Sequence, residues 1–123
     1  MSAFTNISAS EYVIENQFFF CIWDKYPVSP GHLLIISKRE TIDFFDLNPT
    51  ELDSLNQMII LGKELIEVDN QPDGYNIGMN CGGPAGQTIF HFHCHLIPRY
   101  IGDMTDPRGG VRHSVQGKGY YKN

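Results

Sequence analysis

Three of the five histidines of this chain occupy alternate positions, His91, His93 and His95, in the stretch HFHCHLIPRY. The residues that follow each of them are apolar, so the run alternates with a period of two. That alternation is typical of a half-buried β-strand, which directs one set of side chains to a core and the other set outward. The sequence therefore predicts a row of imidazoles on one face of a strand.

Imidazoles in such a row could hold a metal ion. Neighbouring same-face residues on a strand are about 6.6 Å apart, so two of them can converge on one ion. His91 and His95 are about 13 Å apart on an extended strand, so three histidines on one zinc would be strained. A two-histidine site completed by His32 or His113 remains open, although the sequence offers no paired thiols or nearby carboxylates for it. We therefore predict no metal ligands among the site residues.

The row also suits nucleophilic catalysis at phosphorus. A neutral imidazole is a nucleophile near neutral pH, and a bond from it to phosphorus is labile because protonated imidazole leaves readily. Two flanking histidines can orient a central one, stabilise charge on phosphoryl oxygens and protonate a leaving group. This pattern makes His93 the candidate nucleophile. An ordinary surface histidine is a fair interpretation of either flanking residue alone but a poor one for three in register.

A glycine-rich loop precedes the row. Its sequence, NCGGPAGQT, places three glycines where backbone N–H groups can approach phosphate oxygens closely. Asn80, Gln87 and Thr88 add neutral side-chain donors. An ordinary turn would have a similar composition, so the loop alone is weak evidence for a binding site. The histidines that follow it strengthen that interpretation. Together they predict the rim of an anion site.

The rest of the chain predicts the elements that position these residues. Strands are expected at 11–16, 18–24, 32–38, 75–80 and 88–98, the last ended by a proline that cannot donate to a ladder. A helix is expected from the N-cap Asn48, where Pro49 and Glu51 complete a capping pattern, to about Asn70. The order predicts an α+β fold with a mainly antiparallel five-stranded sheet and one long helix packed on one face.

Length, charge and cysteine usage limit the classes of protein. The 123 residues suit one domain, with a catalytic region at 1–105 and a basic tail of the same domain at 106–123. The net charge of −5 argues against nucleic-acid binding. The tail carries a net charge of +3 and is interpreted as a solvated end unless it proves ordered. No segment is apolar enough to span a membrane, no signal peptide begins the sequence, and three unpaired cysteines suit reducing conditions. A cytoplasmic location is therefore expected.

These motifs resemble those of a known family. HFHCHLI fits the His-φ-His-φ-His-φ-φ signature, where φ is apolar, of the histidine-triad (HIT) superfamily of nucleotide hydrolases and transferases. AGQT before it and PGHLLI upstream are similar to that family's flanking segments, and the resemblance runs from about Phe19 to Arg99. It implies a homodimer and a covalent step that needs no metal. Any divalent cation would arrive bound to the substrate polyphosphate.

The resemblance also implies catalytic roles by position. His93 matches the nucleophile, which attacks the α-phosphorus and forms a nucleotidyl-histidine intermediate. His91 and His95 match the flanking residues, which orient the nucleophile and assist the phosphate and the leaving group. His32 matches the fourth histidine of the site, and without the resemblance it would pass for a residue at a strand edge.

Substrate contacts are implied in the same way. Asp24 matches the acid that hydrogen-bonds the ribose hydroxyls. Asn80 and Thr88 match polar residues that touch the phosphates, and Gln87 lies beside them in the glycine-rich loop. Arg108 and the other basic residues of the tail, Arg112 and His113 among them, have no counterpart in the motif.

The leading hypothesis is hydrolysis of dinucleoside polyphosphates, such as diadenosine polyphosphates, at the α-phosphorus. GPAGQT and IPRYIGD look more like the dinucleoside-polyphosphate hydrolases, including the fragile-histidine-triad branch, than like the phosphoramidases. Three alternatives stay open: a purine nucleoside phosphoramidase, a nucleotide-binding regulatory module with little turnover, and a metal-dependent hydrolase. The base and the length of the phosphate chain are not predicted.

Overall fold

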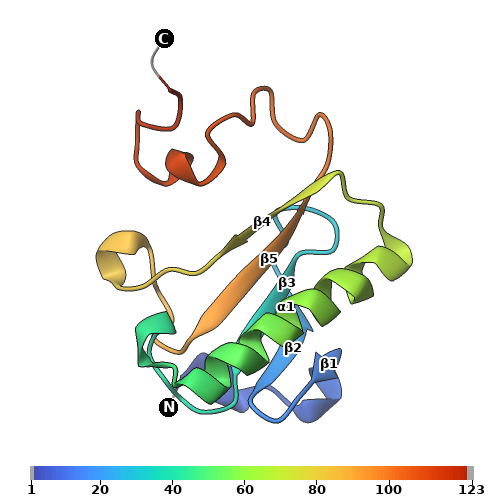
Figure 1. The fold of residues 1–123 in the computed structure, drawn as a ribbon, viewed down its shortest axis with the longest axis vertical. Helices are drawn as coiled ribbons and strands as arrows, with labels where there is room; N and C mark the ends of the chain where they lie inside the picture. Colours follow the sequence, from blue (N-terminus) through green and yellow to red (C-terminus); the bar gives the residue numbers. More distant parts are fainter. Residues whose placement is uncertain (1, 122–123) are drawn as a thin grey trace.

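The computed structural model describes residues 2–121 and contains one antiparallel sheet with one long helix (Figure 1). The sheet order is β1-β2-β3-β5-β4, and every neighbouring pair is antiparallel. The strands are β1 (Ile14–Glu15), β2 (Phe19–Trp23), β3 (Leu33–Ser37), β4 (Gly74–Gly78) and β5 (His93–Arg99). The predicted α+β class, with five strands and one long helix, is confirmed.

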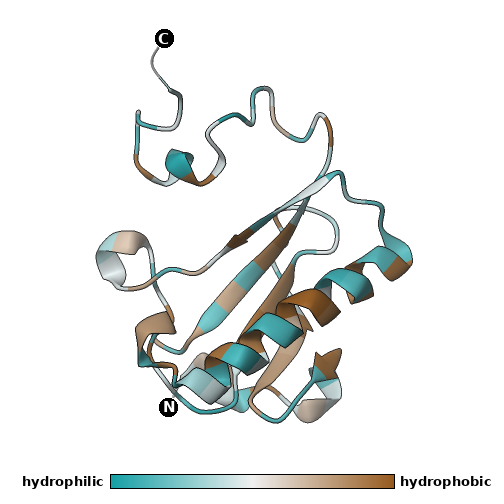
Figure 2. Cartoon of the chain, viewed as in Figure 1, coloured by the Kyte–Doolittle hydropathy of each residue, from teal (hydrophilic) through white to brown (hydrophobic). Residues whose placement is uncertain are grey.

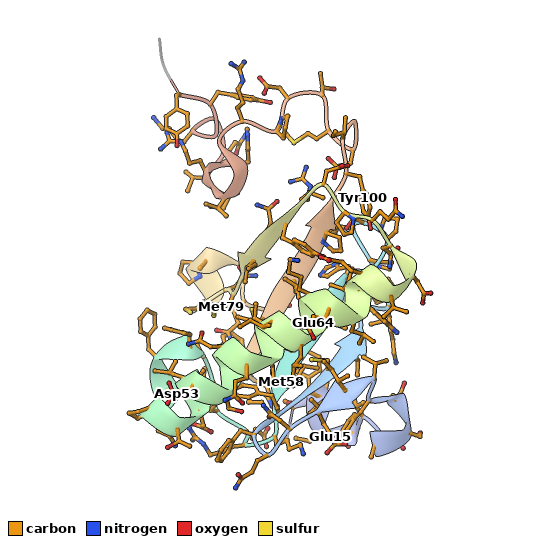
Figure 3. The ribbon with its side chains drawn as sticks, turned by 45° about the vertical axis from the view of Figure 1, so that its right-hand side comes forward. Glu15, Asp53, Met58, Glu64, Met79 and Tyr100 are labelled. Carbon is orange, nitrogen blue, oxygen red and sulfur yellow. The ribbon has the colours of Figure 1, made fainter. Side chains whose placement is uncertain are left out.

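Helix α1 (Pro49–Asp69) begins where the capping pattern predicts. The Asn48 side chain accepts the N–H of Glu51, and the Glu51 carboxylate accepts the N–H of Asn48, so two otherwise unpaired amides are satisfied. Its buried face includes Met58, which lies between helix and sheet (Figure 3). Gly62 allows the close approach, because a Cβ there would lie 2.8 Å from the side chain of Leu33.

The register assigns each strand residue to one of two faces. Cys21, Ile35 and Cys94 form a row on the face that α1 covers, and burial raises the pKa of both thiols to about 12. Successive side chains alternate between faces, so the neighbouring row that contains Ile36 and His93 lies on the face away from the helix. Figure 2 shows β5 with alternating hydrophilic and hydrophobic bands, whereas β2 and β3 lack this alternation. The histidines therefore lie opposite the helix.

The histidine strand is shorter at its start than expected. It begins at His93, not at residue 88. The Phe92 carbonyl still accepts the Ser37 amide at 3.3 Å, but the Phe92 amide donates to the Thr41 carbonyl in the loop after β3 at 2.7 Å. The strand also continues past Pro98 to Arg99. Its pairing with β3 ends at Leu96, so no strand on that side needs the missing N–H of the proline.

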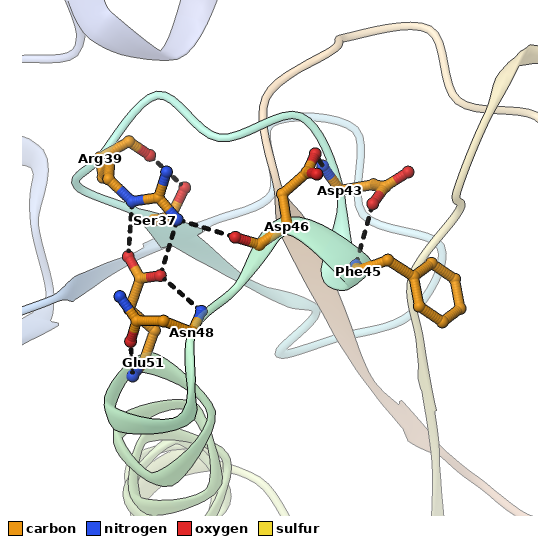
Figure 4. A network of polar contacts seen from close by, with 7 residues as sticks. All are labelled: Ser37, Arg39, Asp43, Phe45, Asp46, Asn48 and Glu51. Carbon is orange, nitrogen blue, oxygen red and sulfur yellow. Dashed lines mark hydrogen bonds and ion pairs between the residues drawn. The ribbon is translucent and has the colours of Figure 1, made fainter.

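A polar network ties the end of β3 to the start of α1 (Figure 4). Arg39 forms a bidentate pair with Glu51, at 2.8 and 3.0 Å, and also donates to the carbonyl of Asp46. The Ser37 hydroxyl donates to the carbonyl of Arg39 at 2.7 Å. Because Glu51 is only 2% exposed, the guanidinium supplies the partner that a buried carboxylate needs. The network fixes the end of β3, next to the histidines.

Segments at both ends of the chain complete the molecule. A 3-10 turn at Ala3–Asn6 packs on the face away from the helix, and a C-terminal segment with a short helical turn at Gly110–Ser114 lies beyond β4 and β5 (Figure 1). The structure describes the tail through residue 121, and Lys122 lies outside the described residues. The three cysteines are free. Over the described residues, no helix is both long and apolar enough to cross a membrane.

Candidate active site

His93 occupies the first position of β5 and is half-buried. Its Nδ1 lies 2.8 Å from the carbonyl oxygen of His91, which can only accept, so Nδ1 carries the proton. Its Nε2 has no hydrogen bond to any described residue, and in the neutral ring this atom holds the lone pair. The ring is also flanked by Phe4 and His95, with centroids at 5.0 and 5.4 Å. The geometry therefore leaves Nε2 of His93 as the candidate nucleophilic atom.

His91 does not belong to an exposed row, because its side chain is only 1% exposed. Its Nε2 lies 2.7 Å from the carbonyl oxygen of Ser37 and its Nδ1 lies 2.6 Å from the hydroxyl of Ser2. The carbonyl requires a proton on Nε2, so Nδ1 accepts from the serine in the neutral ring. Both ring nitrogens of His91 are thus occupied by protein groups, and neither is free for the phosphate contact that the resemblance implies. His91 orients His93 through its carbonyl.

His95 and His32 form a hydrogen-bonded pair whose proton can be located. The backbone N–H of Val28 donates to Nδ1 of His32 at 3.2 Å, so the proton of that neutral ring is on Nε2. Nε2 of His32 lies 2.9 Å from Nδ1 of His95 and donates to it, which leaves Nε2–H of His95 free to donate to a ligand. The resemblance predicted His32 in the site, and the structure places it there.

Burial keeps both members of this pair neutral. Burial, together with the nearby imidazoles of His93 and His32, lowers the pKa of His95 to about 4, although Asp24 opposes the shift. Burial likewise lowers the pKa of His32, and again Asp24 opposes it. Near neutral pH, His95 is therefore a neutral donor that can stabilise a departing oxygen with a hydrogen bond.

Asp24 lies close to this pair. One carboxylate oxygen is 3.4 Å from Nε2 of His32, and the other accepts the N–H of Tyr26 at 2.8 Å. Ligand atoms of Asp24, His32 and His95 lie within 4.8 Å of one another, a spacing that a cation could use. A metal-bound histidine ordinarily donates its second N–H to an acceptor, however, and Nδ1 of His32 faces the donor of Val28. The set suits a hydrogen-bond relay better than a metal.

The glycine-rich loop divides its predicted donors into two groups. Gln87 is 4% exposed: its side-chain oxygen accepts the Gly82 amide, and its NH₂ group donates to the carbonyls of Ile42 and Ile89. It therefore braces the loop and keeps no N–H for a phosphate. Asn80 and Thr88, by contrast, are exposed and have no side-chain hydrogen bond within the described chain. Their side chains are therefore free to make the predicted phosphate contacts.

A cavity of about 470 Å³ opens beside His95, His32 and Asn80. Its wall includes Ile77 and Ile97 from the sheet, and Val111 and Ser114 from the C-terminal segment complete it. Among the described residues, no lysine, arginine, aspartate or glutamate lines it. The cavity is therefore largely apolar, with neutral polar groups at the end that contains the histidines.

The C-terminal segment is folded on itself around His113. The Nε2–H of His113 donates to the carbonyl of Arg108 at 2.9 Å, the Tyr120 ring packs edge-on at 4.5 Å, and a Cβ at Gly119 would collide with the imidazole. Arg108 pairs with Asp106. The segment is thus folded on itself, although most of its described residues are exposed, so its interpretation as a solvated end stays a prediction.

Several residues that hold the histidines carried no signal in the sequence. Ser2, Phe4 and Ser37 contact them across long sequence separations, for example 89 residues between Ser2 and His91. The backbone N–H of Val28 contacts the ring of His32, which is 4 residues away. None belongs to a catalytic motif, and two act through backbone groups that every residue possesses. Only the coordinates could bring them together.

Comparisons with known proteins show which proteins this chain is similar to. A family model described as HIT domain matches residues 6–102. A protein named AP-4-A phosphorylase from Mycobacterium tuberculosis is 33% identical over 94 residues, 74% of this chain and 47% of that protein. A bis(5′-nucleosyl)-tetraphosphatase (asymmetrical) from Schizosaccharomyces pombe is 38% identical over 80 residues, 65% of this chain and 44% of that protein.

A solved structure is similar as well. The hypothetical histidine triad nucleotide-binding protein from Sulfolobus tokodaii superposes with a TM-score of 0.70 at 38% identity, over 78% of this chain and 64% of that one. The chain thus spans less than two thirds of each of these three proteins.

Proposed function

The chain belongs to the HIT family, and on that premise we propose that it hydrolyses nucleotides at the α-phosphorus through a nucleotidyl-histidine intermediate on His93. One observation carries the proposal: the unprotonated Nε2 of His93 stands next to the ring of His95, whose own Nε2–H is free to donate. Nucleophile and donor are thus neighbours on one rigid strand, which is the pairing that a displacement at phosphorus requires.

Each step of the proposed reaction balances without a further reactant. The Nε2 lone pair of His93 attacks phosphorus, a P–N bond forms, and the P–O bond to the leaving group breaks with its electrons. Nδ1–H stays on the ring throughout, and the carbonyl of His91 stabilises the positive charge that develops there. Water then attacks the same phosphorus, the P–N bond breaks, and His93 returns as a neutral imidazole while the water proton passes to solvent.

We propose dinucleoside polyphosphates as the substrates, because a phosphate is a leaving group that needs no proton. His95, whose pKa is lowered to about 4, donates a hydrogen bond to the departing oxygen and need not transfer the proton. The names of two relatives refer to dinucleoside tetraphosphates. No metal is needed for the covalent step in this proposal, and a divalent cation would arrive with the polyphosphate.

A second candidate is hydrolysis of substrates with an uncharged leaving group, such as nucleoside phosphoramidates. The cavity beside His95 supports it, because burying several phosphate charges without cations to pair them is unfavourable. Measuring kcat/KM for diadenosine polyphosphates and for adenosine phosphoramidates separates the two candidates. A strong preference for the amidates would make phosphoramidate hydrolysis the leading proposal.

The decisive experiment replaces the nucleophile. His93→Gly should abolish turnover while nucleotide binding, measured by calorimetry, persists. Mass spectrometry of a quenched wild-type reaction should find the nucleotidyl adduct on His93. An adduct on another residue, or full activity of His93→Gly, would refute the mechanism.

We also propose a homodimer. β4 is an edge strand of the sheet and Ile77 on it is 46% exposed, so a second copy of the chain could pair there. Light scattering of the purified protein tests this proposal.

A further inference from the structure

The N-terminal clasp, defined here as Ser2–Phe4, contacts two histidines of the site. The hydroxyl of Ser2 lies 2.6 Å from Nδ1 of His91, and the ring of Phe4 packs edge-on against both His91 and His93 at 5.6 and 5.0 Å. Both clasp residues precede the segment that the family model matches, which begins at residue 6. The clasp is therefore a feature of this chain that the family motif does not describe.

Each hydrogen bond of Ser2 has a definite direction. Its hydroxyl oxygen accepts the N–H of Phe4 at 3.1 Å as the cap of a 3-10 turn, so its single proton is available for Nδ1 of His91. The backbone N–H of Ser2 donates to the carboxylate of Glu40 at 2.6 Å, which attaches the clasp to the loop after β3. The clasp is thus held at a fixed place on the protein.

The position of His91 depends on such side-chain contacts. His91 precedes β5, so no strand ladder fixes its backbone. Its imidazole is instead anchored at Nε2 by the carbonyl of Ser37 and at Nδ1 by the hydroxyl of Ser2. The carbonyl of His91 in turn orients the ring of His93. Loss of the Ser2 contact should therefore change the orientation of the His93 ring.

We propose that Ser2 and Phe4 are positioning residues for the nucleophile. Together with the Ser37 carbonyl, Ser2 holds His91 in the Nε2–H form. Through the His91 carbonyl, this contact fixes the ring of His93 with Nδ1–H toward that carbonyl and Nε2 correctly aimed. Phe4, which is buried, restricts rotation of the His93 ring. This inference rests on the proposed function, because it assigns the clasp a role in the step that forms the P–N bond.

Three substitutions of Ser2 separate positioning from helix capping. Ser2→Ala removes both the cap and the donated hydrogen bond. Ser2→Asp keeps an oxygen that accepts the N–H of Phe4 but has no proton to donate to His91. Ser2→Thr keeps both functions. Ser8→Ala is the matched control, because Ser8 caps the next 3-10 turn in the same way without contacting a histidine of the site.

The measurements are single-turnover formation of the His93 adduct, steady-state kinetics and ¹⁵N NMR of the histidine rings. Ser2→Ala and Ser2→Asp should lower kcat about tenfold with little change in KM, the effect of one hydrogen bond. Ser2→Thr and Ser8→Ala should keep wild-type kcat. Phe4→Leu should lower kcat by a smaller factor. NMR should place the His91 proton on Nε2 in the wild type.

The outcomes distinguish this inference from the proposed function. If the wild type forms no adduct on His93, the proposed function fails and the clasp inference fails with it. If the adduct forms but its rate is the same in Ser2→Ala and Ser2→Asp, only the clasp inference is overturned. A His91 proton on Nδ1 in the wild type also overturns it, whatever the turnover.

Discussion

Nε2 of His32 lies 2.9 Å from Nδ1 of His95, and the Val28 amide on the opposite nitrogen of His32 determines which atom carries the proton. The relay therefore runs in one direction, from His32 through His95 toward a ligand. It needs neutral rings, since a second proton on His32 would face the N–H of Val28.

Acidification should destabilise the protein through His95. The folded-state pKa, about 4, is lower than the ordinary value of 6.5, so the unfolded chain binds the proton more readily between these values. The stability is complete above pH 6.5 and is lost as the pH falls toward 4. The lowered pKa of His32 acts in the same direction.

Urea unfolding at several pH values measures this effect. Between about pH 7 and about pH 5 the wild type should lose about 1 kcal/mol that His95→Gln does not lose, after allowance for partial exposure. Carboxylates that titrate at the acid end affect both proteins alike, so the difference isolates the histidine. Equal slopes for the two proteins would mean that His95 is not held neutral.

Chelation should leave the activity unchanged. The three potential ligands Asp24, His32 and His95 are arranged with the proton of His32 on Nε2, the atom a cation would need. We therefore expect the same kcat/KM before and after dialysis against a chelator, when an uncharged-leaving-group substrate that binds no cation itself is used. Loss of activity on dialysis and recovery with zinc would instead establish a metal site.

Two residues of the glycine-rich loop should respond differently to substitution. Gln87→Ala removes three buried hydrogen bonds, so it should lower the free energy of unfolding by about 2–3 kcal/mol and raise KM through a disordered loop. Thr88→Val removes an exposed hydroxyl, so it should raise KM about 3- to 10-fold with no loss of stability. Paired unfolding and kinetic measurements distinguish them, and an unchanged KM for Thr88→Val would remove that residue from the phosphate site.

The sequence predicts features that depend on local interactions. The start of α1 follows from Asn48, Pro49 and Glu51 within one helical turn, and the structure reproduces it. The alternation before His93 has the same local form as a strand, but its backbone bonds to Thr41, a partner that no nearby residue reveals. The buried state of His91 depends likewise on Ser37 and Ser2, both far away in the chain.

The C-terminal segment supplies a last prediction, because it encloses the cavity without being bonded to the sheet. Within the described part of the chain, every hydrogen bond of residues 106–121 joins two residues of that segment. A Cβ at Gly119 would lie 1.9 Å from Nδ1 of His113, so Gly119→Ala must displace the ring around which the segment folds. The wall formed by Val111 and Ser114 should move with it.

Gly119→Ala should therefore change substrate selection and loosen the C-terminal segment. Gly119 is buried against His113, so the added methyl group should lower the stability of this segment by about 1–3 kcal/mol, while the core of the sheet loses no contact. The ratio of kcat/KM for uncharged and polyphosphate leaving groups should shift several-fold, and Gln116→Ala, an exposed change in the same segment, should leave it unaltered. If Gly119→Ala keeps the wild-type ratio, the C-terminal segment takes no part in substrate selection, and the sheet residues alone define the cavity.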